Sequence, residues 1–293
     1  MKDSKNGAIC CIGENKPEYF IKLRNLFLSI DRQNGEISKL DRLAFFMAKP
    51  KEEYKRELEK LGVKIINSTP VHPKFPHNNK VRMLERDLGY DWYILLDHDT
   101  IVCRNFTRFL DDGGFKASLV GFKGPPLEFW EKIYRKFNLE IPSIQYISRY
   151  DRKKILPYFN SGVLIVPGYY RKVLYDTWIY HIHELISINE QLDKFAFFID
   201  QIALALALQK TKMKVTILPI EMNFSIVTPI NNSYFHKKLN PYIIHYHNHI
   251  NKKGYLNLKV CKHPGAKKGI KEFNKLLQVY KGDDPEPFAI LKF

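Results

Sequence analysis

The sequence predicts an α/β fold with a doubly wound, mostly parallel sheet and helices on both faces. Two observations carry this prediction. Short apolar runs that fit buried strands alternate with charged, helix-like segments, and glycine or proline often separates them. The run at residues 92–96 is aromatic, β-branched or leucine at every position, as expected for a strand covered on both faces. Such alternation favours βαβ units with right-handed crossovers.

The first half of the chain follows this alternation closely. Pro50 opens and Gly62 closes a charged helix, which is the usual placement of these two residue types at helix ends. In chain order, we expect strands at residues 7–13, 41–48, 63–67, 92–96 and 118–122, and helices at 19–30, 51–61 and 80–88.

The second half contains an interruption. Residues 124–157 are rich in aromatic and basic side chains, and we interpret a segment of about 123–157 as an inserted lid or acceptor-binding element. A helical hairpin with a solvated basic face is the alternative. Beyond it we expect strands at 163–166 and 215–221 and helices at 169–186, within 195–208 and at 267–281. The predicted organisation is one domain, 1–258, followed by a basic helical tail, 259–293.

Composition and charge limit the partners. With 293 residues, 45% hydrophobic and 14% aromatic, the chain can bury a large core and is not disordered. The net charge of +16 implies an anionic partner: a phosphorylated small molecule, an acidic glycan, an anionic membrane face or a nucleic acid. A nucleic acid is not expected, because the sequence has no recognised binding motif and its charges are scattered.

The cysteines and apolar segments bear on location. The four cysteines form no CxxC pair, which argues against a zinc knuckle or a disulfide framework. The N-terminal residues lack the apolar core of a signal peptide. The longest apolar candidate, 195–208, is shorter than the roughly 20 residues that span a bilayer. We expect a cytoplasmic protein, and peripheral contact with the inner face of an anionic membrane stays open.

Two aspartates follow the apolar run at 92–96. If the chain stays extended there, Asp97 and Asp99 leave the same face of the strand. Ligands of open α/β sheets bind at the carboxyl ends of strands, and paired carboxylates suit a divalent, oxygen-preferring ion. The alternative is that both aspartates are ordinary turn residues.

Other polar residues stand at the edges of apolar segments. Asn160, Ser161 and Gly162 precede an apolar strand, where Gly162 permits a close backbone approach or a positive φ. Asp200 and Gln201 lie in an apolar helix, where they are costly unless hydrogen-bonded or functional. A plain turn and a helix N-cap are the respective alternatives.

A histidine-rich stretch lies near the C-terminus. His245, His247 and His249 alternate, so on an extended strand their imidazoles share one face and favour metal or phosphate contact. Lys252 and Lys253 follow within reach of the same ligand. Neither GxGxxG nor GxxxxGK[ST] occurs, so bound phosphates require a metal rather than a glycine cradle.

The succession LLDHD, FNSG, DQ, LPxxxN and IIHYH with trailing lysines resembles the retaining glycosyltransferases of family 8. That family includes glycogenin-like enzymes and bacterial lipopolysaccharide galactosyl- and glucosyltransferases. The similarity extends over about 8–253 and implies the nucleotide-sugar transferase fold called GT-A. Two departures are His98 between the aspartates, where the family has a small residue, and the altered HFxGxxKPW ending, in which Asn248 replaces a glycine.

The resemblance also implies roles for individual residues. Asp97 and Asp99 would hold Mn²⁺ or Mg²⁺ on the donor diphosphate, with His245 or His247 as a further ligand. Asp200 and Gln201 would flank the anomeric carbon of the sugar. The remaining donor-binding positions would be Gly13, Lys80, His98, Asn160, Ser161, Gly162, Lys252 and Lys253.

The sequence therefore predicts a metal-dependent hexosyltransferase. The donor would be a nucleotide diphosphate sugar, UDP-linked by resemblance, and the acceptor a glycan, a lipid-linked molecule or a protein, anionic or membrane-linked if the basic insertion binds it. Retention of configuration requires either a carboxylate nucleophile, for which Asp200 is the candidate, or same-face attack. A nucleotidyltransferase or a metal-dependent phosphohydrolase is the alternative.

Overall fold

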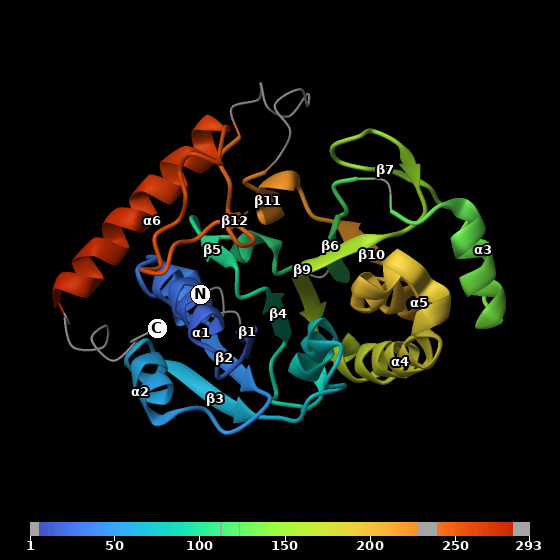
Figure 1. Ribbon diagram of the computed structural model, residues 1–293, viewed down its shortest axis with the longest axis horizontal. Coiled ribbons are helices and arrows are strands. Elements are labelled where there is room, and N and C mark those ends of the chain that lie inside the picture. Colours follow the sequence, from blue (N-terminus) through green and yellow to red (C-terminus); the bar gives the residue numbers. More distant parts are fainter. Residues whose placement is uncertain (1–5, 112, 123, 228–238, 284–293) are drawn as a thin grey trace. The chain divides into compact units, whose positions relative to one another are not determined.

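The computed structural model describes residues 6–111, 113–122, 124–227 and 239–283. Its fold is mixed α/β with a large, mostly parallel sheet, which confirms the predicted fold class (Figure 1). The chain forms two compact units. Unit 1 comprises Met1–Thr69, Leu96–Leu110 and Pro219–Phe293, and unit 2 comprises Pro70–Leu95 and Asp111–Leu218.

Unit 1 is built from βαβ repeats and a small second sheet. Its elements are β1 (Gly7–Gly13), α1 (Pro17–Asp31), η1 (Glu36–Lys39), β2 (Asp41–Phe46), α2 (Glu52–Lys60), β3 (Val63–Asn67), β5 (Thr100–Val102), η3 (Thr107–Phe109), η5 (Ile220–Asn223), β11 (Phe224–Ser225), β12 (Ile243–His245) and α6 (Pro264–Asp283). The strands β1, β2 and β3 are parallel neighbours, as the sequence predicts. In the small sheet, β12 runs parallel to β11 and antiparallel to β5.

Helix α6 is somewhat longer than the predicted tail helix and packs on unit 1. Its apolar side buries Ala266, Ile270, Phe273 and Leu277. Near its C-terminal end, the Tyr280 hydroxyl donates a hydrogen bond of 2.6 Å to Glu57 Oε1 on α2. The helix therefore docks on the rest of unit 1, which was one of the two roles that its amphipathic sequence allows.

Unit 2 combines strands with a pair of adjacent helices, α4 and α5 (Figure 1). Its elements are η2 (Pro76–Leu84), β4 (Trp92–Leu96), β6 (Phe115–Leu119), α3 (Leu127–Lys136), β7 (Tyr146–Ile147), β8 (Lys154–Ile155), β9 (Phe159–Pro167), α4 (Gly168–Ser187), η4 (Asn189–Phe198), α5 (Ile199–Thr211) and β10 (Val215–Ile217). Within this unit the strand order is β10-β6-β9-β4, with β6 parallel to β10 and antiparallel to β9.

The alternative that Asn160, Ser161 and Gly162 form a plain turn is wrong. These residues lie inside β9, and Gly162 does not have a positive φ. The register of the β6–β9 pair shifts between Ala117 and Ser118, so β9 carries extra residues opposite β6. A bulge of this kind re-aims side chains without ending the strand.

Several predicted boundaries also need correction. The helix predicted at 80–88 is instead the 3₁₀ helix η2, which begins four residues before the predicted start. The strand predicted at 118–122 corresponds to β6, which begins three residues before the predicted start. The strand predicted at 215–221 ends at Ile217, because Pro219 cannot donate to a ladder and instead precedes η5. The alternative of a helical hairpin in the insertion is wrong, since one helix, α3, is followed by the β7–β8 hairpin. Lys123, within the predicted insertion, lies outside the described residues.

No helix in the described part of the chain combines the length and apolarity needed to cross a membrane.

Candidate active site

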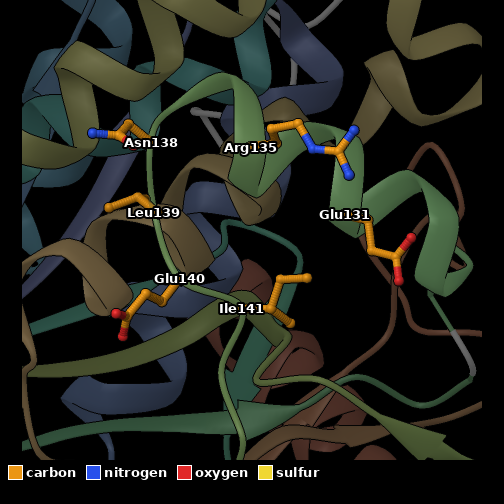
Figure 2. Close-up of a pocket in the computed structure, with 6 residues that line it drawn as sticks. All are labelled: Glu131, Arg135, Asn138, Leu139, Glu140 and Ile141. Carbon is orange, nitrogen blue, oxygen red and sulfur yellow. The ribbon is translucent and has the colours of Figure 1, made fainter.

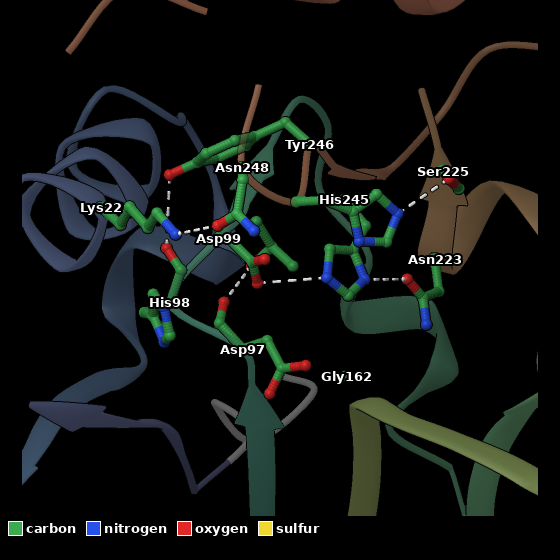
Figure 3. A network of polar contacts seen from close by, with 12 residues as sticks. Lys22, Asp97, His98, Asp99, Gly162, Asn223, Ser225, His245, Tyr246 and Asn248 are labelled. Atoms are coloured by element: carbon green, nitrogen blue, oxygen red, sulfur yellow. Dashed lines mark hydrogen bonds and ion pairs between the residues drawn. The ribbon is translucent and has the colours of Figure 1, made fainter. Parts of the chain in front are cut away.

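The small sheet of unit 1 brings together residues that are far apart in the sequence. Asp99 immediately precedes β5, and His245 is the last residue of β12, paired with Thr100 of β5 and Ser225 of β11. Consequently, one carboxylate and two imidazoles meet at the end of the sheet (Figure 3). Asp99, His245 and His247 offer ligand atoms that all lie within 4.8 Å of one another, and we call them the Asp–His cluster.

His245 lies between two oxygen atoms. Its Nδ1 is 3.1 Å from Asn223 Oδ1, and its Nε2 is 3.1 Å from Asp99 Oδ1 (Figure 3). An amide oxygen only accepts, so Nδ1 carries the proton and a neutral ring directs the Nε2 lone pair at the carboxylate. Two lone pairs at this distance repel unless a proton or a metal cation lies between them. The pair is therefore suited to hold a cation.

The electrostatics of Asp99 agree with that arrangement. Burial alone would raise its pKa, but a proton on the adjacent His245, with smaller contributions from His98 and Lys22, holds the pKa of Asp99 well below its usual range. Asp99 is therefore an anion at any physiological pH. A partly buried carboxylate that stays charged beside imidazoles is a strong ligand for a divalent ion.

His247 completes the cluster from a turn rather than from a strand. Strand β12 ends at His245, and His247 has a φ of 54°, so the predicted strand through all three histidines is wrong. The His247 ring stacks on that of His245, with centroids 4.1 Å apart, and its Nε2 is 2.9 Å from Ser225 Oγ. Burial and the neighbouring His245 lower the pKa of His247 to about 4, which leaves the ring neutral and able to bind a metal. His249 is not in the cluster.

The two aspartates do not continue an extended strand. After β4 the chain turns, and the Asp97 carbonyl accepts hydrogen bonds from the Thr100 amide and hydroxyl. The extended geometry that would place both side chains on one face is therefore wrong. The group of potential metal ligands contains Asp99 but not Asp97. A metal-binding role for Asp97 stays a prediction.

Side chains around the Asp–His cluster fix the turns that carry it. Lys22 on α1 donates a 2.7 Å hydrogen bond to Asn248 Oδ1, and the Tyr246 hydroxyl donates to the His98 carbonyl at 3.4 Å (Figure 3). The His98 ring lies against Tyr19, with centroids 4.9 Å apart. The residue that departs from the family pattern is thus held by packing within unit 1.

Gly13 and the two lysines also lie in unit 1. Gly13 ends β1, and a Cβ there would come within 2.5 Å of the Phe46 ring, so no larger residue fits without displacing that ring. Lys252 and Lys253 are exposed on a turn.

A second polar cluster lies in unit 2. Lys80 Nζ donates a 2.8 Å hydrogen bond to Ser161 Oγ, which in turn donates to Asp200 Oδ2 at 2.5 Å. The ammonium is 3.6 Å from the same carboxylate oxygen, and the Lys80 and Asp200 side chains are only 11% and 5% exposed. We call these residues the Lys–Ser–Asp cluster. The N-cap alternative for Asp200 is wrong, because the N-cap of α5 is Phe198 and has no side-chain hydrogen bond.

The other predicted residues of unit 2 lie beside this cluster in sequence. Asn160 Oδ1 accepts a 2.9 Å hydrogen bond from the Gly162 amide, and Gln201 is partly exposed on the first turn of α5. The Asp200 carbonyl accepts a 2.8 Å bond from Trp178 Nε1, which ties α5 to α4. Among the described cavities, one of about 500 Å³ at the C-terminal end of α3 contains none of the predicted site residues (Figure 2).

Sequence reasoning missed three partners of the Asp–His cluster. Asn223 belongs to the LPxxxN motif, but the motif does not predict its hydrogen bond to His245. Ser225 and Lys22 gave no signal at all, because a single serine or lysine in a strand or helix looks like any surface residue. Only the pairing of β11 with β12 places Ser225 near His247.

A family model described as the Rhodobacterales glycosyltransferase domain matches residues 32–212. No curated protein matches the chain.

Solved structures share the fold at low sequence identity. A galactosyltransferase, LgtC, in complex with donor and acceptor sugar analogs is 15% identical, with a TM-score of 0.59 over 93% of this chain and 95% of that one. Mouse xyloside xylosyltransferase 1 is 15% identical, with a TM-score of 0.52 over 82% and 96%. The glycosyltransferase GlyE of Streptococcus pneumoniae TIGR4 is 16% identical, with a TM-score of 0.55 over 96% of this chain and 64% of that one.

Proposed function

We propose that this chain, which belongs to the Rhodobacterales glycosyltransferase domain family, moves a hexose from a UDP-linked donor to a glycan or lipid-linked acceptor with retention of configuration and with a divalent metal ion. Family membership makes the chain a glycosyltransferase and removes support from a nucleotidyltransferase or a phosphohydrolase. The metal, the nucleotide, the stereochemistry and the acceptor are our proposal.

The observation that carries the proposal is the Asp–His cluster. Its two imidazoles have hydrogen-bond partners, Asn223 and Ser225, that orient the rings. Such outer partners are typical of histidines that bind metals. One carboxylate and two imidazoles form a mixed oxygen and nitrogen site for a divalent ion, for which we propose Mn²⁺, and they leave positions for the oxygen atoms of a diphosphate. A bound ion would stabilise the charge that develops on the diphosphate as the sugar leaves.

For the sugar, we propose the Lys–Ser–Asp cluster of unit 2. Among the described residues, the hydrogen bond from Ser161 and the ion pair with Lys80 both reach Oδ2 of the Asp200 carboxylate. Oδ1 is therefore the oxygen that could attack or stabilise the anomeric carbon. An ionised carboxylate fits either route to retention: a covalent glycosyl ester followed by attack of the acceptor, or stabilisation of an oxocarbenium ion during same-face attack.

For the acceptor, we propose the basic insertion as the binding surface. Arg152, Lys153 and Lys154 are exposed. Arg149 is buried, with its guanidinium donating to the Leu218 carbonyl at 2.8 Å, so it holds the unit together rather than facing a ligand. Neutralising the three exposed residues should raise the KM for an anionic acceptor and leave slow donor hydrolysis unchanged. Equal loss of both activities would contradict this assignment.

Contact with an anionic membrane is a further part of the proposal. Lys268, Lys271 and Lys275 are exposed on α6, on the side opposite its docked apolar residues. A row of lysines near an anionic surface gains favourable energy for each charge. Sedimentation with anionic but not neutral vesicles would support this contact, and equal sedimentation with both would contradict it.

The experiment that tests the proposed activity is a donor panel. Sugars linked to UDP, GDP, ADP and CMP are incubated with the protein and Mn²⁺, or with a chelator, and the released nucleotide is identified. We expect that UDP is released from a UDP-sugar when Mn²⁺ is present and not when the chelator is present. Release of pyrophosphate or inorganic phosphate from the intact nucleotide sugar would instead indicate a nucleotidyltransferase or a phosphohydrolase.

A further inference from the structure

The lysine-bearing turn of unit 1 has a defined internal structure. We call residues 251–256 the lysine turn. The Gly254 amide donates to the Asn251 carbonyl at 2.8 Å, and Asn251 Oδ1 accepts from the amides of Lys253 and Tyr255 at 2.9 and 3.0 Å. Gly254 has a φ of 85°, which favours glycine. Asparagine at the first and glycine at the last position place Lys252 and Lys253 at the exposed corner.

Helix α6 holds this turn through the side chain of Asn274. Asn274 Oδ1 accepts a 2.9 Å hydrogen bond from the Leu256 amide, and Asn274 Nδ2 donates a 3.0 Å bond to the Leu256 carbonyl. One amide side chain therefore satisfies both backbone groups of one residue of the turn, as a neighbouring strand would. That is a specific, two-point attachment of the turn to the helix.

The next turns of α6 add two more contacts on the same side. Lys281 Nζ donates to the Lys253 carbonyl and lies 4.5 Å from the centre of the Tyr255 ring. Leu277 approaches Gly254 so closely that a Cβ there would be 3.4 Å from its methyl group. Asn274, Leu277 and Lys281 are spaced by three and four residues, so they share one face of the helix.

Helix α6, which makes these contacts, is itself held along one side. Its apolar side is buried on unit 1, and Tyr280 donates to Glu57 of α2. From α1, Asn25 Nδ2 donates 2.8 Å to the Gly254 carbonyl. The lysine turn is thus held by two helices that are parts of the packed core of unit 1.

We infer that α6 is part of the donor-binding apparatus, and that Asn274 is a positioning residue that holds Lys252 and Lys253 ready for the phosphates of the donor. This inference rests on the proposed function, because it takes those lysines to contact the diphosphate. A turn that is held before the ligand arrives loses less conformational freedom on binding, so affinity for the phosphates is higher. The C-terminal helix then contributes to catalysis without touching the substrate.

The test compares Asn274→Ala with Gln278→Ala, which removes an amide from the exposed side of the same helix. Calorimetry measures the Kd for UDP and for uridine at saturating Mn²⁺, and the Kd for Mn²⁺ alone. For Asn274→Ala we expect UDP to bind about tenfold more weakly, with uridine and Mn²⁺ unchanged. Gln278→Ala should bind all three like the wild type. If Asn274→Ala loses the binding of uridine and Mn²⁺ as well as that of UDP, the variant is generally unfolded and the inference is overturned.

A second variant covers the case in which Asn274→Ala does not fold. Lys281→Gln removes the ammonium donor to the Lys253 carbonyl near the end of α6, and we expect UDP binding to weaken severalfold, again without an effect on uridine. Unchanged UDP binding in both variants, while Lys252→Ala with Lys253→Ala weakens it, would overturn the role of α6 and leave the proposed function standing. If the wild type binds no UDP with Mn²⁺, the proposed function fails and the inference fails with it.

Discussion

The two polar clusters differ in how their charges are balanced. In the Lys–Ser–Asp cluster of unit 2, an ammonium, a hydroxyl and a carboxylate contact one another, so a positive and a negative charge are paired. In the Asp–His cluster of unit 1, Asp99 Oδ1 lies 3.1 Å from His245 Nε2. The hydrogen-bond partners of the two rings are Asn223, at His245 Nδ1, and Ser225, at His247 Nε2. The first cluster is complete without a ligand, whereas the second has room for a cation between its members. Substitutions should therefore affect sugar transfer and stability in the first cluster and metal affinity in the second.

The largest expected effect is that of Asp200→Asn. The change removes the only charge that balances Lys80 within its cluster, and it removes the candidate nucleophile. We expect sugar transfer to fall by roughly two to four orders of magnitude. Mn²⁺ affinity, measured by calorimetry, should stay at the wild-type value because the Asp–His cluster is intact. A variant with near-normal transfer would show that Asp200 has no direct role.

The next effect separates the two histidines. His245 contacts Asp99 and Asn223, whereas His247 stacks on His245 from a turn. His245→Ala should weaken Mn²⁺ binding by roughly 100-fold or more, His247→Ala by less, and Asn223→Ala, which acts through His245, by roughly tenfold. Calorimetric titration gives the ranking. A larger effect for His247→Ala would make His247 the principal ligand.

A smaller effect is expected for Ser161→Ala. Its hydroxyl links the Lys80 ammonium and the Asp200 carboxylate, and a hydrogen bond to a charged group contributes about 1.5–3 kcal/mol. We expect lower stability and about tenfold slower transfer. Ser118→Ala is the matched control, because Ser118 is buried on the neighbouring strand β6 and its hydroxyl has no partner among the described residues. Equal effects of the two changes would argue against the link.

The smallest expected effect is on the pH dependence of stability, and it comes from a histidine outside both clusters. His181 is buried on α4, and burial, with a minor contribution from Lys210, lowers its pKa to about 4. Between pH 6.5 and 4 the unfolded chain binds a proton that the folded chain does not, so stability falls as the pH falls through this window. The Tm of His181→Phe should fall less than that of the wild type over the same range. If the Tm of the two proteins falls equally with pH, His181 does not contribute to the pH dependence of stability.

The strands and helices could largely be predicted from sequence, and several residues singled out there do lie together in the two clusters, but the geometry of those clusters could not be predicted. The βαβ alternation of unit 1 is local, and each strand and helix carries its own apolar pattern. The turn after Leu96 and the turn at His247 depend on partners distant in sequence, since Asp99 and His245 meet only because β5 pairs with β12. The bulge that contains Ser161 is likewise a property of strand pairing and has no signature in one strand alone.

The extent of α6 was predictable, and its role was not. Its amphipathic pattern indicates a docked helix or a basic surface, but the attachment of Asn274 to Leu256 joins residues whose contact requires the fold. Asparagine in a helix is unremarkable in a sequence. Its two-point bond to a backbone turn is visible only in the structure.

The central claim is that the Asp–His cluster holds a divalent ion shared with the donor diphosphate. If the ion binds both, metal and UDP must bind cooperatively, because each completes the site of the other. We expect the Tm to rise much more with Mn²⁺ and UDP together than the sum of the two separate shifts. Asp99→Asn keeps the shape of the side chain, and it should abolish the joint shift without unfolding the chain. Additive shifts in the wild type, or a joint shift that survives in Asp99→Asn, would contradict the claim.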